Sequence, residues 1–309
     1  MLHFIVNPAS SSGNAAHMWT LISKKLAKKN VSYNAHLTTG TFAATKFARE
    51  ICQMDDDPTI IVIGGDGTVN EVLTGIDDFD KVTFGYIPAG SSNDLARDLG
   101  LTTDPEAALS AILNPTEYIN LDVGRIVAGE DVRNFAVSAG IGYDASICHE
   151  ALHSNIKSFL NKIHLGKLTY VIIALKQLAK APRHACTICL DDNEPISFSN
   201  YLFTAVMIHR YEGGGFMFCP EAKYDDGILD VCAVHNIFKL KVLRMLPTAY
   251  NGEHTKFKGI DIYKCRKITI TSEKPAPIHT DGESCGVHSE VTMYLNAAKL
   301  KMIYKASCP

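Results

Sequence analysis

The residues Thr59-Ile60-Ile61-Val62-Ile63 run directly into Gly64-Gly65-Asp66-Gly67-Thr68. An uninterrupted apolar run of this kind is typical of a buried strand in a parallel sheet. The three glycines let backbone N–H groups approach an anion with no Cβ in the way. Val69–Leu73 predicts the first turns of a helix, whose N-terminus attracts phosphate. Asp66 adds a carboxylate where phosphate transfer needs Mg²⁺ or a proton acceptor, so this junction predicts a phosphate site.

The alternation of strand and helix extends to both sides of this junction. Predicted strands at Leu2–Val6, Tyr33–Leu37 and Thr83–Ile87 are separated from one another by helical patterns, among them Ala16–Lys29 and Thr41–Met54. Strands joined by helices of this length form parallel βαβ units with right-handed crossovers. Ligands in such sheets gather beyond the carboxyl ends of the strands, so the loops there are the candidate site.

The pattern changes after about Tyr118, where predicted strands follow one another with turns between them. Tyr118–Val127 and Val132–Ala139 are the first two of these predicted strands. Consecutive strands joined by turns predict a mainly antiparallel β-sandwich. We therefore expect an α/β domain over residues 1–120, completed by residues 299–309, and a sandwich domain over residues 121–298. The active cleft is expected between the two domains.

Composition narrows the class of protein. The chain has 309 residues, 46% hydrophobic and 20% charged, which is enough for two domains and ordinary for a globular protein. The net charge of −3 argues against general nucleic-acid binding. No apolar run reaches the ~20 residues of a membrane span, and the N-terminus predicts a strand rather than a signal peptide. The nine cysteines show no repeated metal spacing, so free thiols and a cytoplasmic location are expected.

Two further loops offer groups that bind phosphate. Asn7-Pro8-Ala9-Ser10-Ser11-Ser12-Gly13-Asn14 follows the first predicted strand, and Gly90-Ser91-Ser92-Asn93-Asp94 follows the fourth. Hydroxyls and glycine N–H groups can donate hydrogen bonds to phosphate oxygens. An ordinary βα loop with a helix cap is the alternative for the first loop. For Asp94, the alternatives are a bond to a substrate hydroxyl or metal, or helix capping.

Together these residues resemble the diacylglycerol kinase catalytic-domain family, and most closely its soluble bacterial lipid kinases. The resemblance extends to sphingosine kinases and, more distantly, to NAD kinases. It runs from Asn7-Pro8 through Asn134–Ala145 and Gly213–Asp230 to Asp281-Gly282-Glu283. It implies a Rossmann-like N-terminal domain, a second β-sandwich domain, and transfer of the γ-phosphate of ATP, with Mg²⁺, to the hydroxyl of diacylglycerol or a related lipid. A small-molecule or NAD kinase and a catalytically silent nucleotide-binding regulator stay as alternatives.

The resemblance also implies roles for individual residues. Glu283 becomes the general base with Asp281 beside it, and Asp66 is the rival base. Without the resemblance, Asp281-Gly282 would be an ordinary hairpin turn. A structural Mg²⁺ is implied at the Asp226 carboxylate and the carbonyls of Lys223 and Ile228. The implied nucleotide contacts are Asn7, Ser10, Ser11, Ser12, Gly13, Asn14, Thr38, Gly64, Gly65, Asp66, Gly67, Thr68, Val69, Asn70, Glu71, Gly90, Ser91, Asn93 and Asp94.

Residues 156–183 carry basic side chains and no Asp or Glu, and they include a helical apolar stripe. A basic amphipathic helix can rest on anionic lipid, so transient contact with the inner membrane face is expected here. The alternative is a helix packed on the sandwich with a solvated basic face. The expected partner is the lipid substrate, nucleic acid is not expected, and a homodimer is left open.

Overall fold

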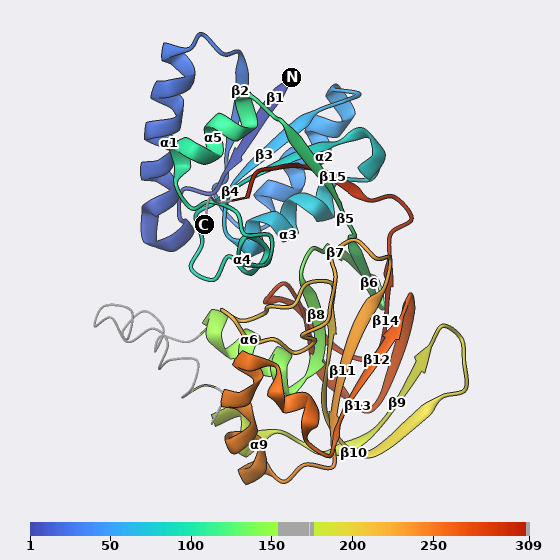
Figure 1. Cartoon of the computed structure of the whole chain (residues 1–309). Coiled ribbons are helices and arrows are strands. Elements are labelled where there is room, and N and C mark those ends of the chain that lie inside the picture. The colour runs from blue at the N-terminus through green and yellow to red at the C-terminus, as the bar shows by residue number, and fades with distance from the viewer. Residues whose placement is uncertain (154–172, 174–175, 307–309) are drawn as a thin grey trace.

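Figure 1 shows the computed structural model, which describes residues 1–153, 173 and 176–306. The first sheet has six strands in the order β2-β1-β3-β4-β15-β5. All neighbours pair in parallel except β15 and β5, which are antiparallel. The strands are β1 (Leu2–Val6), β2 (Tyr33–Leu37), β3 (Thr59–Gly64), β4 (Thr83–Pro88), β5 (Glu117–Leu121) and β15 (Leu300–Tyr304).

Helices cover both faces of this sheet because its central strand is apolar on both faces. Ile60 and Val62 of β3 pack in the core with residues of α2 and α3, whereas Ile61 and Ile63 pack with α1 and α5. All four side chains are fully buried, and each contributes about 1.5–3 kcal/mol to folding. The elements are α1 (Ser10–Lys28), α2 (Ala43–Met54), α3 (Asp66–Gly75), α4 (Asp94–Asp98), α5 (Pro105–Leu113) and the 3₁₀ turn η1 (Phe79–Lys81).

The second sheet is antiparallel throughout. Its path is β12-β11-β10-β8-β13-β14-β6-β7, and β9 pairs with both β10 and β13. The expected combination of a parallel sheet with helices and a second antiparallel β domain is therefore confirmed. The strands are β6 (Gly124–Ala128), β7 (Asp131–Phe135), β8 (Ser138–Gly142), β9 (His184–Leu190), β10 (Ile196–Met207), β11 (Leu229–His235), β12 (Ile260–Cys265), β13 (Lys267–Thr280) and β14 (Glu283–Leu295).

Few helical elements accompany this sheet in the described part of the chain. They are α6 (Tyr143–His153), α9 (Lys239–Met245), the 3₁₀ turns η2 (Leu246–Asn251) and η3 (Glu253–Lys256), and a helical stretch at residues 176–180. No helix of the described residues is long and apolar enough to cross a membrane. The basic segment 156–183, predicted to contact a membrane surface, lies outside the described residues except at 173 and 176–183.

The prediction of one strand over Tyr118–Val127 is wrong. β5 pairs with β15 in the first sheet, whereas β6 pairs with β14 in the second. The buried residues Asp122 and Val123 separate them, and the Asp122 N–H donates to the Tyr224 carbonyl at 2.7 Å instead of continuing a ladder. The chain thus passes between the sheets here, and it returns between β14 and β15 (Figure 1). Val132–Ala139 is likewise two strands, β7 and β8.

Candidate active site

The carboxyl ends of β1, β3 and β4 meet at one edge of the first sheet. The Asn7 N–H donates to the Ile63 carbonyl at 2.9 Å, and the Ala89 N–H donates to the Gly64 carbonyl at 2.7 Å. A Cβ at Gly90 would lie only 2.5 Å from the Gly65 Cα, so only glycine permits this approach. These loops line a cleft of about 310 Å³ whose other wall comes from the second domain.

Most of the expected nucleotide contacts face this cleft. Those that line it are Asn7, Ser10, Ser11, Gly65, Asp66, Gly67, Thr68, Glu71, Gly90, Ser91 and Asp94. Those that are not among its lining residues are Ser12, Gly13, Asn14, Thr38, Gly64, Val69, Asn70 and Asn93. The expected catalytic residues Asp281 and Glu283 also line it, together with Asp66.

The first loop turns through an unusual backbone. Ser11, Ser12 and Gly13 have φ values of 50°, 57° and 97°, so α1 becomes regular only beyond them. The Asn14 amide points forward along the helix and donates to the Met18 sulfur at 3.6 Å. Ser10 and Ser11 of this loop therefore line the cleft, whereas Ser12, Gly13 and Asn14 do not.

Several predicted contacts support the site instead of lining it. The Asn70 amide donates to the Asn134 carbonyl and to Asp281, both at 2.9 Å, and so joins α3 to the second domain. The Asn93 side chain accepts from the Gly90 N–H at 2.9 Å and closes its own loop. Glu71 lines the cleft, yet its carboxylate accepts the Phe42 and Ala44 N–H groups at the start of α2.

Asp66 links two loops through its carboxylate. The N–H groups of Asp94 and Leu95 donate to it at 3.1 and 3.4 Å, so Asp66, rather than Asp94, caps α4. Burial is the main cause that raises the pKa of Asp66 to about 7, and the charge of Asp94 adds to it. A carboxylate that is desolvated in this way gains most from a nearby cation.

Asp94 is buried and contacts the second domain. The Gly214 N–H donates to its Oδ2 at 2.9 Å, and Arg97 lies 3.6 Å from its Oδ1. Its Oδ1 has no hydrogen-bond partner among the described residues. Burial raises the pKa of Asp94 as well, so Asp66 and Asp94 form an acidic pair that suits Mg²⁺.

Asp281 and Gly282 form the two-residue turn between β13 and β14. Both have positive φ, 48° and 82°, as a type I′ hairpin requires. The Asp281 carboxylate accepts four donors: the Asn70 amide and the N–H groups of Ala136, Val137 and Ser138, at 2.8–3.0 Å. Burial raises the pKa of Asp281, and the four donors oppose that rise by stabilising its ionised form. The same hydrogen bonds lock the turn to both domains.

Glu283 follows this turn and reaches the glycine-rich loop of the first domain. A Cβ at Gly67 would collide with the Glu283 carboxylate. A carboxylate from β14 and the first turn of α3 are therefore in direct proximity although they are far apart in the sequence. Among the described residues that line the cleft, none is Lys or Arg. Phosphate groups would therefore be held by backbone N–H groups and by a metal ion.

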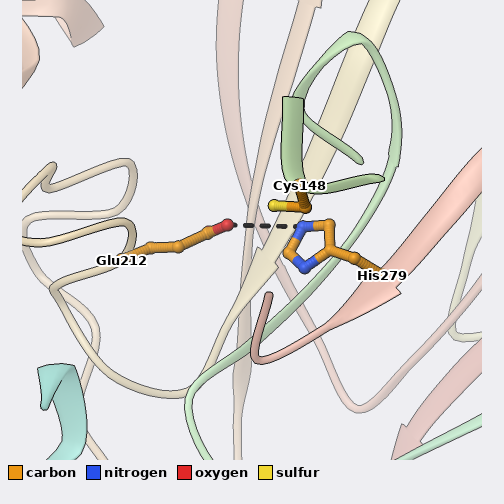
Figure 2. A group of neighbouring side chains, drawn as sticks. All are labelled: Cys148, Glu212 and His279. Carbon is orange, nitrogen blue, oxygen red and sulfur yellow. Dashed lines mark ion pairs between the residues drawn. The ribbon is translucent and has the colours of Figure 1, made fainter. Parts of the chain in front are cut away.

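Three residues that the sequence analysis did not single out form a cluster at the cleft. Figure 2 shows Glu212 directed at His279, with Cys148 beside them, and the ligand atoms of the three lie within 4.8 Å of one another. Glu212 and Cys148 line the cleft. The acid precedes the Gly213–Gly215 run, which was the one local signal that could have drawn attention to it.

The expected metal ligands lie elsewhere, at a second cavity of about 530 Å³ lined by Lys223 and Asp226 but not by Ile228. One oxygen of the exposed Asp226 carboxylate accepts the Ile228 N–H at 3.1 Å. Its other oxygen fits a largely hydrated Mg²⁺, which takes few protein ligands. The neighbouring turn is already held by protein groups, because Lys299 bridges Asp122 at 3.0 Å and the Asp225 carbonyl at 2.6 Å.

Comparisons with known proteins agree with this architecture. The family model "Diacylglycerol kinase catalytic domain" matches residues 1–126, and "YegS C-terminal NAD kinase beta sandwich-like domain" matches residues 137–303. The "Putative lipid kinase YtlR" of Bacillus subtilis (strain 168) is 30% identical over 288 residues, which cover 92% of this chain and 93% of that protein. A "Diacylglycerol kinase" of Mycobacterium tuberculosis (strain CDC 1551 / Oshkosh) is 30% identical and covers 75% of this chain and 73% of its own length.

Solved structures with a similar fold include a putative diacylglycerol kinase and an NAD kinase. The "Crystal structure of a putative diacylglycerol kinase from Bacillus anthracis str. Sterne" has a TM-score of 0.75 at 25% identity and covers 98% of this chain and 95% of its own. An NAD kinase from Archaeoglobus fulgidus in complex with ATP shares only the fold, with a TM-score of 0.54 at 15% identity over 98% of this chain and 94% of its own. The chain therefore belongs to the diacylglycerol kinase catalytic-domain family of lipid kinases, with a YegS-type C-terminal domain.

Proposed function

We propose that this chain transfers the γ-phosphate of ATP to the hydroxyl group of diacylglycerol or a related lipid. The observation that carries the proposal is the position of Glu283 against the Gly67 backbone at the start of α3. A helix N-terminus preceded by glycines binds phosphate, and a carboxylate beside it can accept the proton of an attacking hydroxyl. The acceptor would enter from the second domain and attack in line with the bond that breaks.

Glu283 suits the role of general base better than Asp66. The Asp66 carboxylate is engaged by two backbone N–H groups of α4. It lies in an acidic pair with Asp94, and these two residues would hold Mg²⁺. When bound there, Mg²⁺ would neutralise the charge that develops on the phosphates during transfer. Asp281 would act by fixing the turn that carries Glu283.

Three further proposals accompany this function. A second Mg²⁺ would bind at Asp226 with the carbonyls of Lys223 and Ile228. The protein would act in the cytoplasm and would contact the inner membrane face transiently, through residues 156–183, to reach its substrate. A homodimer is the oligomeric state to be tested first. Sedimentation with and without anionic vesicles measures the membrane contact and the oligomeric state.

The direct test is incubation of the purified chain with labelled ATP and a total lipid extract, followed by identification of the labelled product. Parallel arms with short-chain diacylglycerol and with NAD separate a lipid kinase from a small-molecule kinase. We expect label in a lipid and none in NAD. Binding of ATP without label in any lipid would support a silent regulator and would contradict the proposal.

A matched pair of variants tests the base. Glu283→Gln should lower kcat at least about 100-fold, since general acid–base catalysis contributes about 10²–10⁴-fold. Glu290→Gln lies on the same strand, β14, at an exposed position, and it should keep wild-type activity. A Glu283→Gln variant with undiminished kcat would rule out Glu283 as the base.

A further inference from the structure

Glu212 is a buried acid at the cleft, and its two carboxylate oxygens differ in their partners among the described residues. The residue is 8% exposed, and its Oε1 lies 3.3 Å from the His279 Nε2. Its Oε2 is buried and has no hydrogen-bond partner among the described residues, yet Glu212 lines the cleft. A buried carboxylate oxygen left without a donor is costly, so such an oxygen marks a place where a ligand supplies one.

The surroundings hold Glu212 in this position. Its backbone exchanges two hydrogen bonds with Phe216, at 2.8 and 2.9 Å. His279 is shared between two acids, because its Nε2 also lies 3.1 Å from Asp144 Oδ2. A single N–H thus serves two carboxylates, and Asp144 Oδ1 has no partner in the described chain either. The neighbouring Ser138 hydroxyl is a second possible donor to Glu212. The four carboxylate oxygens of the cluster thus share two donors.

A metal ion does not fit this cluster as it is arranged. The Gly282 N–H donates to His279 Nδ1 at 3.3 Å, so Nδ1 provides the lone pair and Nε2 carries the proton. A metal at Nε2 requires the opposite tautomer, in which Nδ1 donates its proton to a neighbour. The side chains shown in Figure 2 therefore form a hydrogen-bonded acid–imidazole pair with one oxygen open to the cleft.

The cluster lies on the acceptor side of the cleft. Glu212, Ser138 and Cys148 belong to the second domain, opposite the glycine-rich loops of the first. Burial raises the pKa of Cys148 well above its ordinary value, and the charges of both Glu212 and Glu283 contribute to that rise. His279 connects the two acids, since Gly282, its hydrogen-bond partner, directly precedes Glu283. A group bound by Glu212 would therefore lie near the reacting hydroxyl.

We propose that Glu212 binds a hydrogen-bond donor, a second hydroxyl or an amine, on the head group of the acceptor lipid beside the hydroxyl that is phosphorylated. This inference rests on the proposed lipid kinase activity and specifies its substrate class. Diacylglycerol has one hydroxyl and no other donor, so it would leave Glu212 Oε2 unsatisfied. Sites built to pair with a polar group discriminate strongly against analogues that lack it.

The test compares three acceptors of matched chain length in the same detergent micelles: a diacylglycerol, a monoacylglycerol with its second hydroxyl, and a long-chain 2-amino alcohol. For the wild-type chain we expect kcat/KM to be about 10–100-fold higher for at least one donor-bearing acceptor than for diacylglycerol. Glu212→Ala should reduce this ratio to about one by raising KM for that acceptor, with little change for diacylglycerol. The exposed Glu194→Gln is the matched control.

Glu212→Gln distinguishes the two sources of the donor and serves as the second variant if Glu212→Ala fails to fold. The amide oxygen still accepts from a hydroxyl, so a hydroxyl preference would be partly retained, whereas a preference for an ammonium group would be lost with the charge. Equal kcat/KM for all three acceptors in wild type, or a uniform loss in Glu212→Ala, would overturn the inference while leaving the kinase proposal intact.

Two other results would also overturn the inference. Zinc in the purified protein, measured by mass spectrometry and lost in Cys148→Ser, would show that the cluster binds metal instead. A wild-type chain that binds ATP but phosphorylates none of the three acceptors would refute the proposed function itself, and this inference with it.

Discussion

The surroundings of Asp66 disfavour its ionised form. Burial, with the carboxylates of Asp94 and Asp281, raises its pKa to about 7 from 3.8. Between about pH 4 and pH 7 the folded chain keeps a proton on Asp66 that the unfolded chain releases. The native state thus binds more protons in this window, and the free energy of unfolding falls as pH rises through it.

Asp66→Asn removes the buried negative charge and, with it, the loss of stability at high pH. It should also remove the activity. We expect the ligand-free variant to be more stable than wild type at pH 8 by on the order of 1–2 kcal/mol, less than the full effect of the pKa shift because Asn is the poorer acceptor. At pH 4 the two should melt alike, and kcat should fall at least about 100-fold. Calorimetry at both pH values and a kinase assay measure these effects. An equal Tm shift at pH 4 and pH 8 would contradict the assignment.

Gly67 is required by its neighbour rather than by its backbone angles. In Gly67→Ala the new Cβ would displace the Glu283 carboxylate, which is the movable end of a side chain. Alanine also favours a helix by about 1 kcal/mol over glycine, so we expect unchanged or slightly higher stability and a kcat at least about tenfold lower.

Gly40→Ala is the control for Gly67→Ala, since nothing lies within 4 Å of a Cβ at Gly40. It should leave both kcat and Tm near wild type. If Gly67→Ala kept full activity, Glu283 could not need its present position against α3.

At the scale of elements, the β13–β14 turn joins the two domains through one carboxylate. Asp281→Asn would leave a single acceptor oxygen and would direct an NH₂ group toward the backbone donors of residues 136–138. We expect the free energy of unfolding to fall by about 2–3 kcal/mol. Urea unfolding measures it, and Asp192→Asn, in an exposed turn, should change stability by less than about 0.5 kcal/mol. Equal effects would show that the four donors to Asp281 matter little.

The sequence was most informative where local pattern and topology agree. Apolar runs such as β3 with helices between them are enough to predict a parallel sheet, and the ends of such strands meet at one edge. The break between β5 and β6 could not be seen, because Asp122 and Val123 interrupt the apolar pattern too briefly. The position of Asp122 depends on hydrogen bonds with Tyr224 and Gly227, and that of Val123 on a hydrogen bond from Asn296, all more than a hundred residues further along the chain.

The cluster of Cys148, Glu212 and His279 could not be predicted from the sequence for a similar reason. Glu212 has no periodic pattern around it. Its partner His279 comes from β13, and Asp144, which shares His279 with it, comes from α6. Only the tertiary structure brings them together. By contrast, the local turn chemistry of Asp281-Gly282 and the motif that contains it were visible in the sequence, which is why Glu283 could be singled out.

At the scale of the whole molecule, the cleft is an acidic space between two domains. Asp66, Asp94, Glu212, Asp281 and Glu283 line it, and the lining described here contains no Lys or Arg. A bare triphosphate would be repelled by these carboxylates, whereas its Mg²⁺ complex would bridge them. The nucleotide should therefore bind tightly only together with the metal.

A thermal shift experiment tests this coupling. A non-hydrolysable ATP analogue with Mg²⁺ at about 100 times its Kd should stabilise the chain by about 2.7 kcal/mol, or about 5 °C in Tm for a protein of this size. The analogue with EDTA should give little shift, and Asp66→Asn should lose most of the metal-dependent part. Because the backbone N–H groups that face the phosphates are unchanged in that variant, a residual metal-independent shift would measure their contribution alone. Equal shifts with and without Mg²⁺ would mean that the carboxylates of the cleft do not hold the metal.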